Sequence, residues 1–170
     1  MANTYTLISS NVLSGAAASV TFSSIPSTYT DLVIRTSTRT DGPNVGSYFT
    51  YYYNSDTSSK SVTYLERDNA NVVASFRDTV NEAWGASTAA SATTNTFGSA
   101  EVYIPNYAGT DNKPSSAFGA GESNAANGPR MAISANLTQL TSAVTSITLS
   151  GGDGSFLAGS SFYLYGIKNS

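Results

Sequence analysis

The sequence has 170 residues, of which 40% are hydrophobic and only 11% charged, against roughly 25% charged residues in ordinary soluble domains. Its formal net charge is −3 and its eight Lys and Arg residues are scattered, which disfavours nucleic-acid binding because that needs clustered cations. It contains no His and no Cys, so the commonest general base, the commonest transition-metal ligand and any disulfide or thiolate site are excluded.

Segments with strand character follow one another along the whole chain. The pattern predicts about ten short strands, from residues 5–8, 19–23, 32–38, 47–53, 61–66, 72–76, 100–105, 115–121, 130–137, 143–149 and 160–168. Turn clusters such as Asp41–Asn44 and Gly151–Gly154 separate them. This spacing predicts a single all-β domain spanning residues 1–170, an antiparallel β-sandwich of the jelly-roll kind.

Two segments are apolar on both faces of a strand. They are Leu32–Ile34 and the closing stretch Phe162–Ile167, in which Phe162 and Leu164 alternate with Tyr163 and Tyr165. A strand that is apolar on both faces needs neighbours on both edges and cover on at least one face. We therefore expect both segments to lie in the interior of a sheet.

The stretch between residues 78 and 96 is the least decided part of the sequence. Val80–Trp84 is compatible with one helical turn, and the small residues of Gly85–Ala92 indicate a long loop. The N-terminus has no basic segment followed by an apolar one, and no apolar run approaches the roughly 20 residues of a membrane helix. We accordingly expect neither a secretion signal nor a membrane partner.

Acidic residues offer several candidate pairs for glycoside hydrolysis, which needs two carboxylates. The candidates are Glu66, Asp68, Asp78, Glu82 and Glu101. Solvated or ion-paired carboxylates explain the same pattern. The turns at Asp41 and Asp153 are rich in oxygen atoms but lack the spacing of a calcium loop. We expect no enzymatic activity, no cofactor, no catalytic residue and no metal site.

Aromatic residues gather in the middle of the chain. Tyr48, Tyr51, Tyr53 and Trp84 are the candidate contact residues, with Tyr52 and Tyr64 beside them. Two interpretations stay open, because such rings suit a sugar-binding platform as well as an oligomer contact or half-buried strand positions.

Several segments resemble small structural proteins of tailed phages, notably cyanophages. The matching stretches are Ser19–Pro26, Tyr29–Arg35, Asn95–Gly98, Glu101–Ala108 and Phe162–Ile167. They are strand and turn motifs that recur from one end of the chain to the other. The resemblance implies a non-enzymatic virion component, on the head or on the tail of the particle.

The expected place on the particle follows from the layout of the chain. One compact domain without a shaft favours a capsid decoration or cement protein, which stabilises contacts between major capsid proteins on the outer capsid surface. We expect a homotrimer, with its subunit contact on the tyrosine-rich strand and its capsid contact at the termini. The alternative is a tail-fibre or appendage module that binds a host-surface glycan.

Overall fold

The computed structural model describes residues 4–57, 60–67, 70, 72–80, 83–124, 128 and 130–168. This described part contains twelve strands and no helix, and all strand pairs within its two sheets are antiparallel. The strands are β1 (Tyr5–Val12), β2 (Ser19–Phe22), β3 (Asp31–Thr38), β4 (Gly46–Tyr53), β5 (Lys60–Arg67), β6 (Val73–Val80), β7 (Ala83–Thr88), β8 (Gly98–Ile104), β9 (Lys113–Gly121), β10 (Arg130–Thr138), β11 (Ile147–Gly151) and β12 (Ser161–Ile167).

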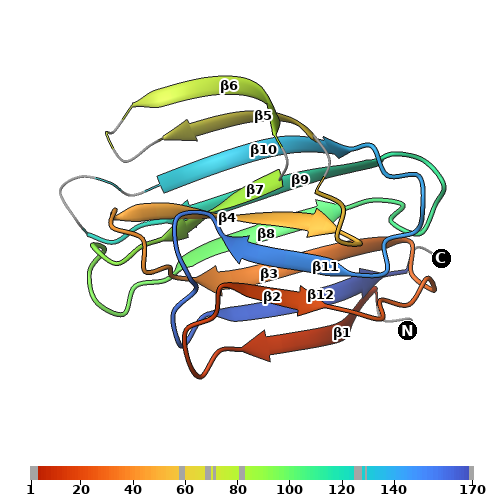
Figure 1. Ribbon diagram of the computed structural model, residues 1–170, viewed down its shortest axis with the longest axis horizontal. Coiled ribbons are helices and arrows are strands. Elements are labelled where there is room, and N and C mark those ends of the chain that lie inside the picture. Colours follow the sequence, from red (N-terminus) through yellow and green to blue (C-terminus); the bar gives the residue numbers. More distant parts are fainter. Residues whose placement is uncertain are drawn as a thin grey trace.

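The strand order is that of a jelly roll with two inserted hairpins. One sheet has the order β1-β12-β3-β8-β9-β10-β5-β6 and the other the order β2-β11-β4-β7. The first four strands of the larger sheet and the four of the smaller sheet form the eight-stranded double Greek key of a jelly roll. The hairpins β9–β10 and β5–β6 extend the larger sheet on the side of β8. β9 and β10 still face β7 of the smaller sheet, whereas β6 lies beyond it (Figure 1). The sequence-based prediction of a jelly-roll-like sandwich is therefore confirmed.

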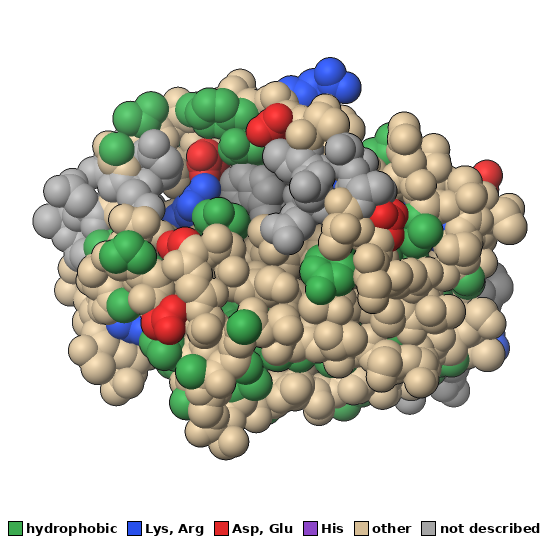
Figure 2. Space-filling model, viewed as in Figure 1, with side chains coloured by type: hydrophobic (Ala, Val, Ile, Leu, Met, Phe, Trp, Pro, Cys, Tyr) green, Lys and Arg blue, Asp and Glu red, His purple; other side chains and the backbone are tan. Residues whose placement is uncertain are grey.

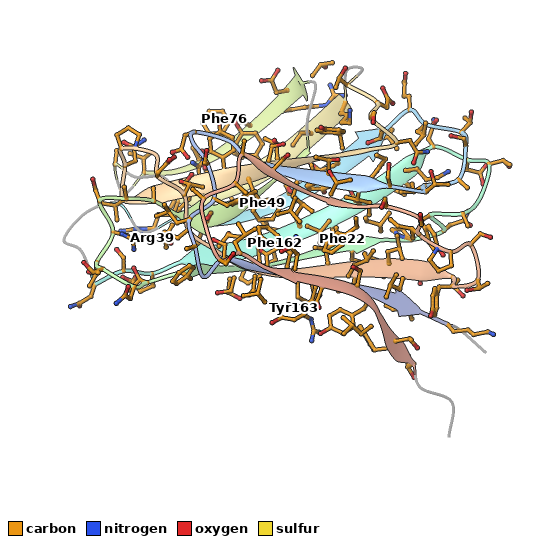
Figure 3. The ribbon with its side chains drawn as sticks, turned by 60° about the horizontal axis from the view of Figure 1, so that its bottom comes forward. Phe22, Arg39, Phe49, Phe76, Phe162 and Tyr163 are labelled. Carbon is orange, nitrogen blue, oxygen red and sulfur yellow. The ribbon has the colours of Figure 1, made fainter. Side chains whose placement is uncertain are left out.

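The closing strand is interior to the larger sheet, as its two apolar faces predict. β12 pairs with β1 on one edge and with β3 on the other, and β3 pairs in turn with β8. Phe162 and Leu164 are fully buried, and Phe162 meets Phe156 edge to face with ring centroids 4.9 Å apart. Figure 3 shows Phe162 between the two sheets and Tyr163 on the outer side. The main core thus forms where these two sheets face each other.

The stretch expected to hold a helical turn and a long loop is different in the structure. Val80 ends β6, and Ala83–Thr88 form the edge strand β7; residues 81 and 82 lie outside the described residues. The prediction was wrong because β7 has only small residues at its centre. A Cβ added to Gly119 on the facing sheet would lie 2.9 Å from the Ala86 nitrogen. The sheets approach too closely here for large side chains, so the usual anchors of a strand are missing.

Candidate interaction surface

Two of the four predicted contact residues lie inside the protein. Tyr51 and Tyr53 are at most 1% exposed and belong to the main core, where their rings lie 6.0 Å apart. β4, which carries them, is covered on both edges by β11 and β7. Because their side chains face the core, neither can contact a partner of the folded subunit. The predicted contact role is therefore corrected to a packing role for Tyr51 and Tyr53.

The hydroxyl groups of these two tyrosines differ in their partners. The Tyr51 hydroxyl lies 3.0 Å from the Ser115 hydroxyl and accepts a hydrogen bond of 3.1 Å from the Asn136 amide. The Tyr53 hydroxyl is buried without a hydrogen-bond partner among the described residues. Burial raises the pKa of both hydroxyls, and the neighbouring Tyr53 raises the pKa of Tyr51 further.

Conservative substitutions should separate these two roles. We expect Tyr51→Phe to lower the free energy of unfolding by about 1 kcal/mol, because Ser115 and Asn136 lose a buried partner. Tyr53→Phe should be neutral or slightly stabilising, because it removes an unpaired hydroxyl.

An unfolded tyrosine ionises near pH 10. Since the folded-state pKa values are raised, stability is retained below about pH 10 and falls as the pH rises above it. Urea unfolding between pH 8 and 11.5 should show a shallower alkaline decline for Tyr53→Phe than for the wild type.

Tyr48, unlike Tyr51 and Tyr53, lies against a second, smaller cluster of buried side chains. Tyr48 is half-buried, packs against this cluster of Val62, Ala86 and Ala132, and has the Arg130 guanidinium 5.2 Å from its ring centroid. Trp84 is the second residue of β7, but its side chain lies outside what the structure describes. The structure therefore does not assemble the four aromatics into one exposed platform.

The described candidate carboxylates lie on three different strands, and each accepts a hydrogen bond from a neighbouring residue. Glu66 accepts a 2.6 Å hydrogen bond from Arg130, and Glu101 forms an exposed ion pair with Arg35 at 2.9 Å. Asp78 accepts a hydrogen bond from the Thr79 amide. Asp68 and Glu82 lie outside the described residues.

The two oxygen-rich turns come together in space. The Asp153 carboxylate accepts hydrogen bonds from the hydroxyls of Thr40 and Ser47, and the Asp41 carboxylate accepts one from the Ser155 amide. These bonds hold the β11–β12 connection against the β3–β4 connection and the start of β4. Within the described residues there is no group of three His, Cys, Asp or Glu side chains able to hold a metal ion.

An exposed apolar group occupies the outer face of the larger sheet. It consists of Leu65, Val73, Phe118, Met131 and Ile133, which are 50–70% exposed, and we call it the outer apolar patch. Leu65, Ile133 and Phe118 stand directly opposite one another on β5, β10 and β9. With Val73 on β6, the patch crosses four adjacent strands, about 15 Å at the usual strand spacing.

Shallow hollows lie between the protruding side chains of the outer apolar patch. One of about 110 Å³ lies among all five residues of the patch, and a second of about 260 Å³ lies between Phe118, Ile133 and Tyr103. Neither has the depth or the convergent polar groups of a small-molecule site. A corrugated, largely uncharged surface of this kind suits contact with another protein.

The patch exists because β9 and β10 turn polar side chains toward the interior and large apolar side chains toward the solvent. In β10, the polar Ser134 and Asn136 are buried, whereas Met131 and Ile133 are exposed. β9 does the same, with Ser115 buried and Phe118 exposed. Alternating strands normally turn their apolar side inward. Sequence reasoning missed the patch because alternation alone does not say which face is buried.

A second group on the outer face is aromatic and charged. The Arg35 guanidinium lies 5.7 Å from the Tyr5 ring centroid and 6.0 Å from that of Tyr165, and it pairs with Glu101. We call these four residues the Arg35 group. They come from β3, β1, β12 and β8, which are adjacent in the sheet although distant in sequence. Only the register across these four strands brings the four residues together.

The opposite face of the molecule has a different character. Figure 2 shows it to be mostly polar and uncharged, with few charged side chains and with apolar side chains gathered at the edge formed by β5 and β6. No described segment forms a helix long and apolar enough to cross a membrane.

Comparisons with known proteins give no family. No protein-family model matches the chain, and no curated protein is similar to it. One solved structure, of a candidate pore-forming toxin from Bacteroides vulgatus ATCC 8482, is similar over 85% of this chain with 9% identity and a TM-score of 0.12. The chain spans 59% of the length of that structure. A TM-score this low carries no argument about fold or function.

Proposed function

We propose that this protein is a non-enzymatic structural component of a phage virion, a decoration or cement protein on the outer capsid surface. The observation that carries the proposal is the reversed alternation of β9 and β10, which exposes Phe118, Met131 and Ile133 on a broad sheet face. Leaving large apolar side chains in water is unfavourable, and covering them in an assembly removes that cost. The resemblance to small phage structural proteins gives the class of assembly.

The outer face of the larger sheet is the proposed contact with the major capsid protein. The central row of Leu65, Ile133 and Phe118 carries no charge, and Arg67 is the charged residue between Met131 and Val73. The nearby Arg35 and Glu101 neutralise each other at 2.9 Å. Ions buried in a permanent interface must be desolvated and are rarely net stabilising, so an uncharged surface suits a lasting contact. The same face includes β1 and β12, where the two ends of the chain lie together, so the proposed contact takes in the termini.

The protein acts in this proposal as a homotrimer that spans a junction between shell subunits. A threefold cap presents the same face to each shell subunit and opposes their separation under the internal pressure of packed DNA. The tyrosine-rich strand is no longer the proposed contact between subunits, because Tyr51 and Tyr53 are core residues.

A charge placed on the outer apolar patch should block this function without unfolding the protein. We expect Phe118→Asp to weaken binding to shells that lack the protein by at least 10-fold, because a carboxylate would be buried in an apolar contact. Thermal rupture of decorated and undecorated particles measures the consequence. Ser19→Asp is the matched control, since it adds the same charge to an exposed position on the smaller sheet. Two results together would contradict the cement function. The isolated protein would sediment as a monomer, and its removal would leave the rupture temperature of the particles unchanged.

The Arg35 group favours a second candidate function, a glycan-binding module of a tail fibre or appendage. Exposed tyrosine rings beside a guanidinium and a carboxylate offer both stacking and hydrogen bonding. In that case Tyr165→Ala should abolish adsorption to host cells while Phe118→Asp leaves it unchanged. The cement function predicts the reverse dependence for binding to shells.

A further inference from the structure

β6 forms the outer edge of the larger sheet. It pairs with β5 on one side, and no described strand pairs with its other side. The ribbon places β6 at the periphery of the molecule, beyond the smaller sheet (Figure 1). An edge strand presents a row of backbone N–H and C=O groups that another strand can use.

The other three sheet edges are protected. β1 has a bulge between Leu7 and Ser9, β2 is only four residues long, and β7 has six residues, of which Thr88 bridges to Arg39. Bulges, short length and cover are the usual means by which proteins prevent edge-to-edge pairing. β6 has none of these features, because its eight residues keep an unbroken register with β5 from Val73 to Val80.

The side chains of β6 also lack the usual protection. The strand contains no Pro and no Lys, and its two charges, Arg77 and Asp78, cancel. Val73 is 70% exposed and Phe76 is 47% exposed. The Phe76 ring lies 5.2 Å from the Tyr64 ring, and Figure 3 shows it at the outer rim of the sheet. A long, regular edge strand that exposes Val73 and Phe76 is a surface that pairing with another strand would cover.

We propose that β6 pairs antiparallel with β6 of a second copy of this chain, about a two-fold axis that passes beside Phe76. In this register Phe76 faces its own counterpart and Ser75 faces Arg77 of the second copy. A two-fold axis perpendicular to the sheet keeps each residue on its own face, so only alternate registers are allowed. The contact would join two subunits through a continuous sheet. It is separate from the threefold contact of the proposed homotrimer, because a two-fold contact closes on two subunits.

Charge and packing choose a second copy and this register. Shifting the axis to Arg77 or Asp78 would set two like charges directly opposite each other, which is destabilising. Shifting it to Ser75 would pair Phe76 with Ala74 and leave the two rings apart. The Phe76 register avoids both, because Asp78 then faces Ala74 and the two rings pair. In this register the strand therefore matches a second copy of itself through the paired rings, with no like charges directly opposite each other.

Opposite charges placed at Ser75 should act in opposite directions. Ser75 is exposed, so substitutions there leave the subunit intact. Ser75→Glu would face Arg77 of the second copy and should lower the dissociation constant of self-association about 2- to 10-fold. Ser75→Lys would face the same arginine and should raise it by a similar factor. Sedimentation of the purified full-length chain over a concentration series measures both.

A single cysteine tests the register directly, because the chain has no cysteine of its own. Directly opposite residues have Cβ atoms about 4.5–5.5 Å apart, whereas diagonal neighbours are about 7–8 Å apart. Phe76→Cys should therefore give a covalent dimer under mild oxidation. Ser75→Cys alone should not, although it should link to Arg77→Cys when the two variants are mixed.

Three outcomes would overturn the proposal. The first is wild-type protein without concentration-dependent association. The second is an equal loss of association for Ser75→Glu and Ser75→Lys, which indicates the register centred on Ser75. The third is absence of a Phe76→Cys dimer while Val12→Cys on the other edge forms one. None of these tests uses a phage particle, so the failure of this contact and the failure of the cement function are distinguishable.

Discussion

Replacing Phe162 by alanine should lower the free energy of unfolding by about 3–5 kcal/mol, the usual cost of removing a buried phenylalanine ring. Phe162 is fully buried in β12 and packs edge to face against Phe156, which is also fully buried. Both rings belong to the main core between the two sheets. The closely packed side chains around them can collapse only partly into the space that the ring leaves.

The same substitution at Phe118 provides the matched control. Phe118 is 54% exposed on the outer face, so Phe118→Ala should change the free energy of unfolding by less than about 1 kcal/mol. Urea unfolding, followed by tyrosine fluorescence, compares the two variants in the same buffer. Equal losses at the two positions would mean that the outer face is part of the folded core, which would contradict its assignment as an interaction surface.

The sequence was most informative where a strand is apolar on both faces. Leu32–Ile34 and Phe162–Ile167 lie in β3 and β12, the adjacent interior strands of the larger sheet. An apolar residue at every position leaves no solvated face, so the prediction did not depend on knowing which side was inward. The jelly roll followed from many short strands, since a sandwich is the common way to bury them.

Alternating strands were less informative, because alternation fixes two faces without saying which is buried. In β10 the buried face carries Ser134 and Asn136, and the exposed face carries Ile133. The smaller sheet lies close to this region, and a Cβ added to Gly119 of β9 would already lie within 3.1 Å of the Ala86 Cβ. Small and polar residues fit so narrow a space, and the large apolar residues of the same strands are then left outside.

The Arg35 group and β7 show two further limits. The Arg35 group depends on a register across four strands, and single-sequence reasoning has no access to pairings between such distant segments. β7 has strand geometry because it hydrogen-bonds to β4, with Gly85 opposite Phe49, and its own residues give little sign of it. In both cases the structure of a segment depends on the strand that pairs with it, which the residues of the segment itself do not reveal.

Replacing Arg39 by alanine should be as damaging as the loss of a core ring, at about 3–5 kcal/mol. Arg39 is 8% exposed, and its guanidinium donates hydrogen bonds of 2.8–3.1 Å to the carbonyl oxygens of Ala90, Ala92, Thr93 and Thr96. These carbonyls belong to the connection between β7 and β8. A planar group with five N–H donors can hold several carbonyls at once, so the side chain fixes the path of this connection.

Arg39→Lys and Arg35→Ala are the controls for this prediction. Lysine keeps the charge but offers three donors from one atom, so it should recover only part of the loss. Arg35, on β3, forms an exposed ion pair with Glu101. Arg35→Ala should therefore lower the free energy of unfolding by less than about 1 kcal/mol. At roughly 2–4 °C per kcal/mol for a domain of this size, Arg39→Ala should lower the Tm by about 10 °C. Equal Tm values for Arg39→Ala and Arg35→Ala would show that the β7–β8 connection holds its path without the buried guanidinium.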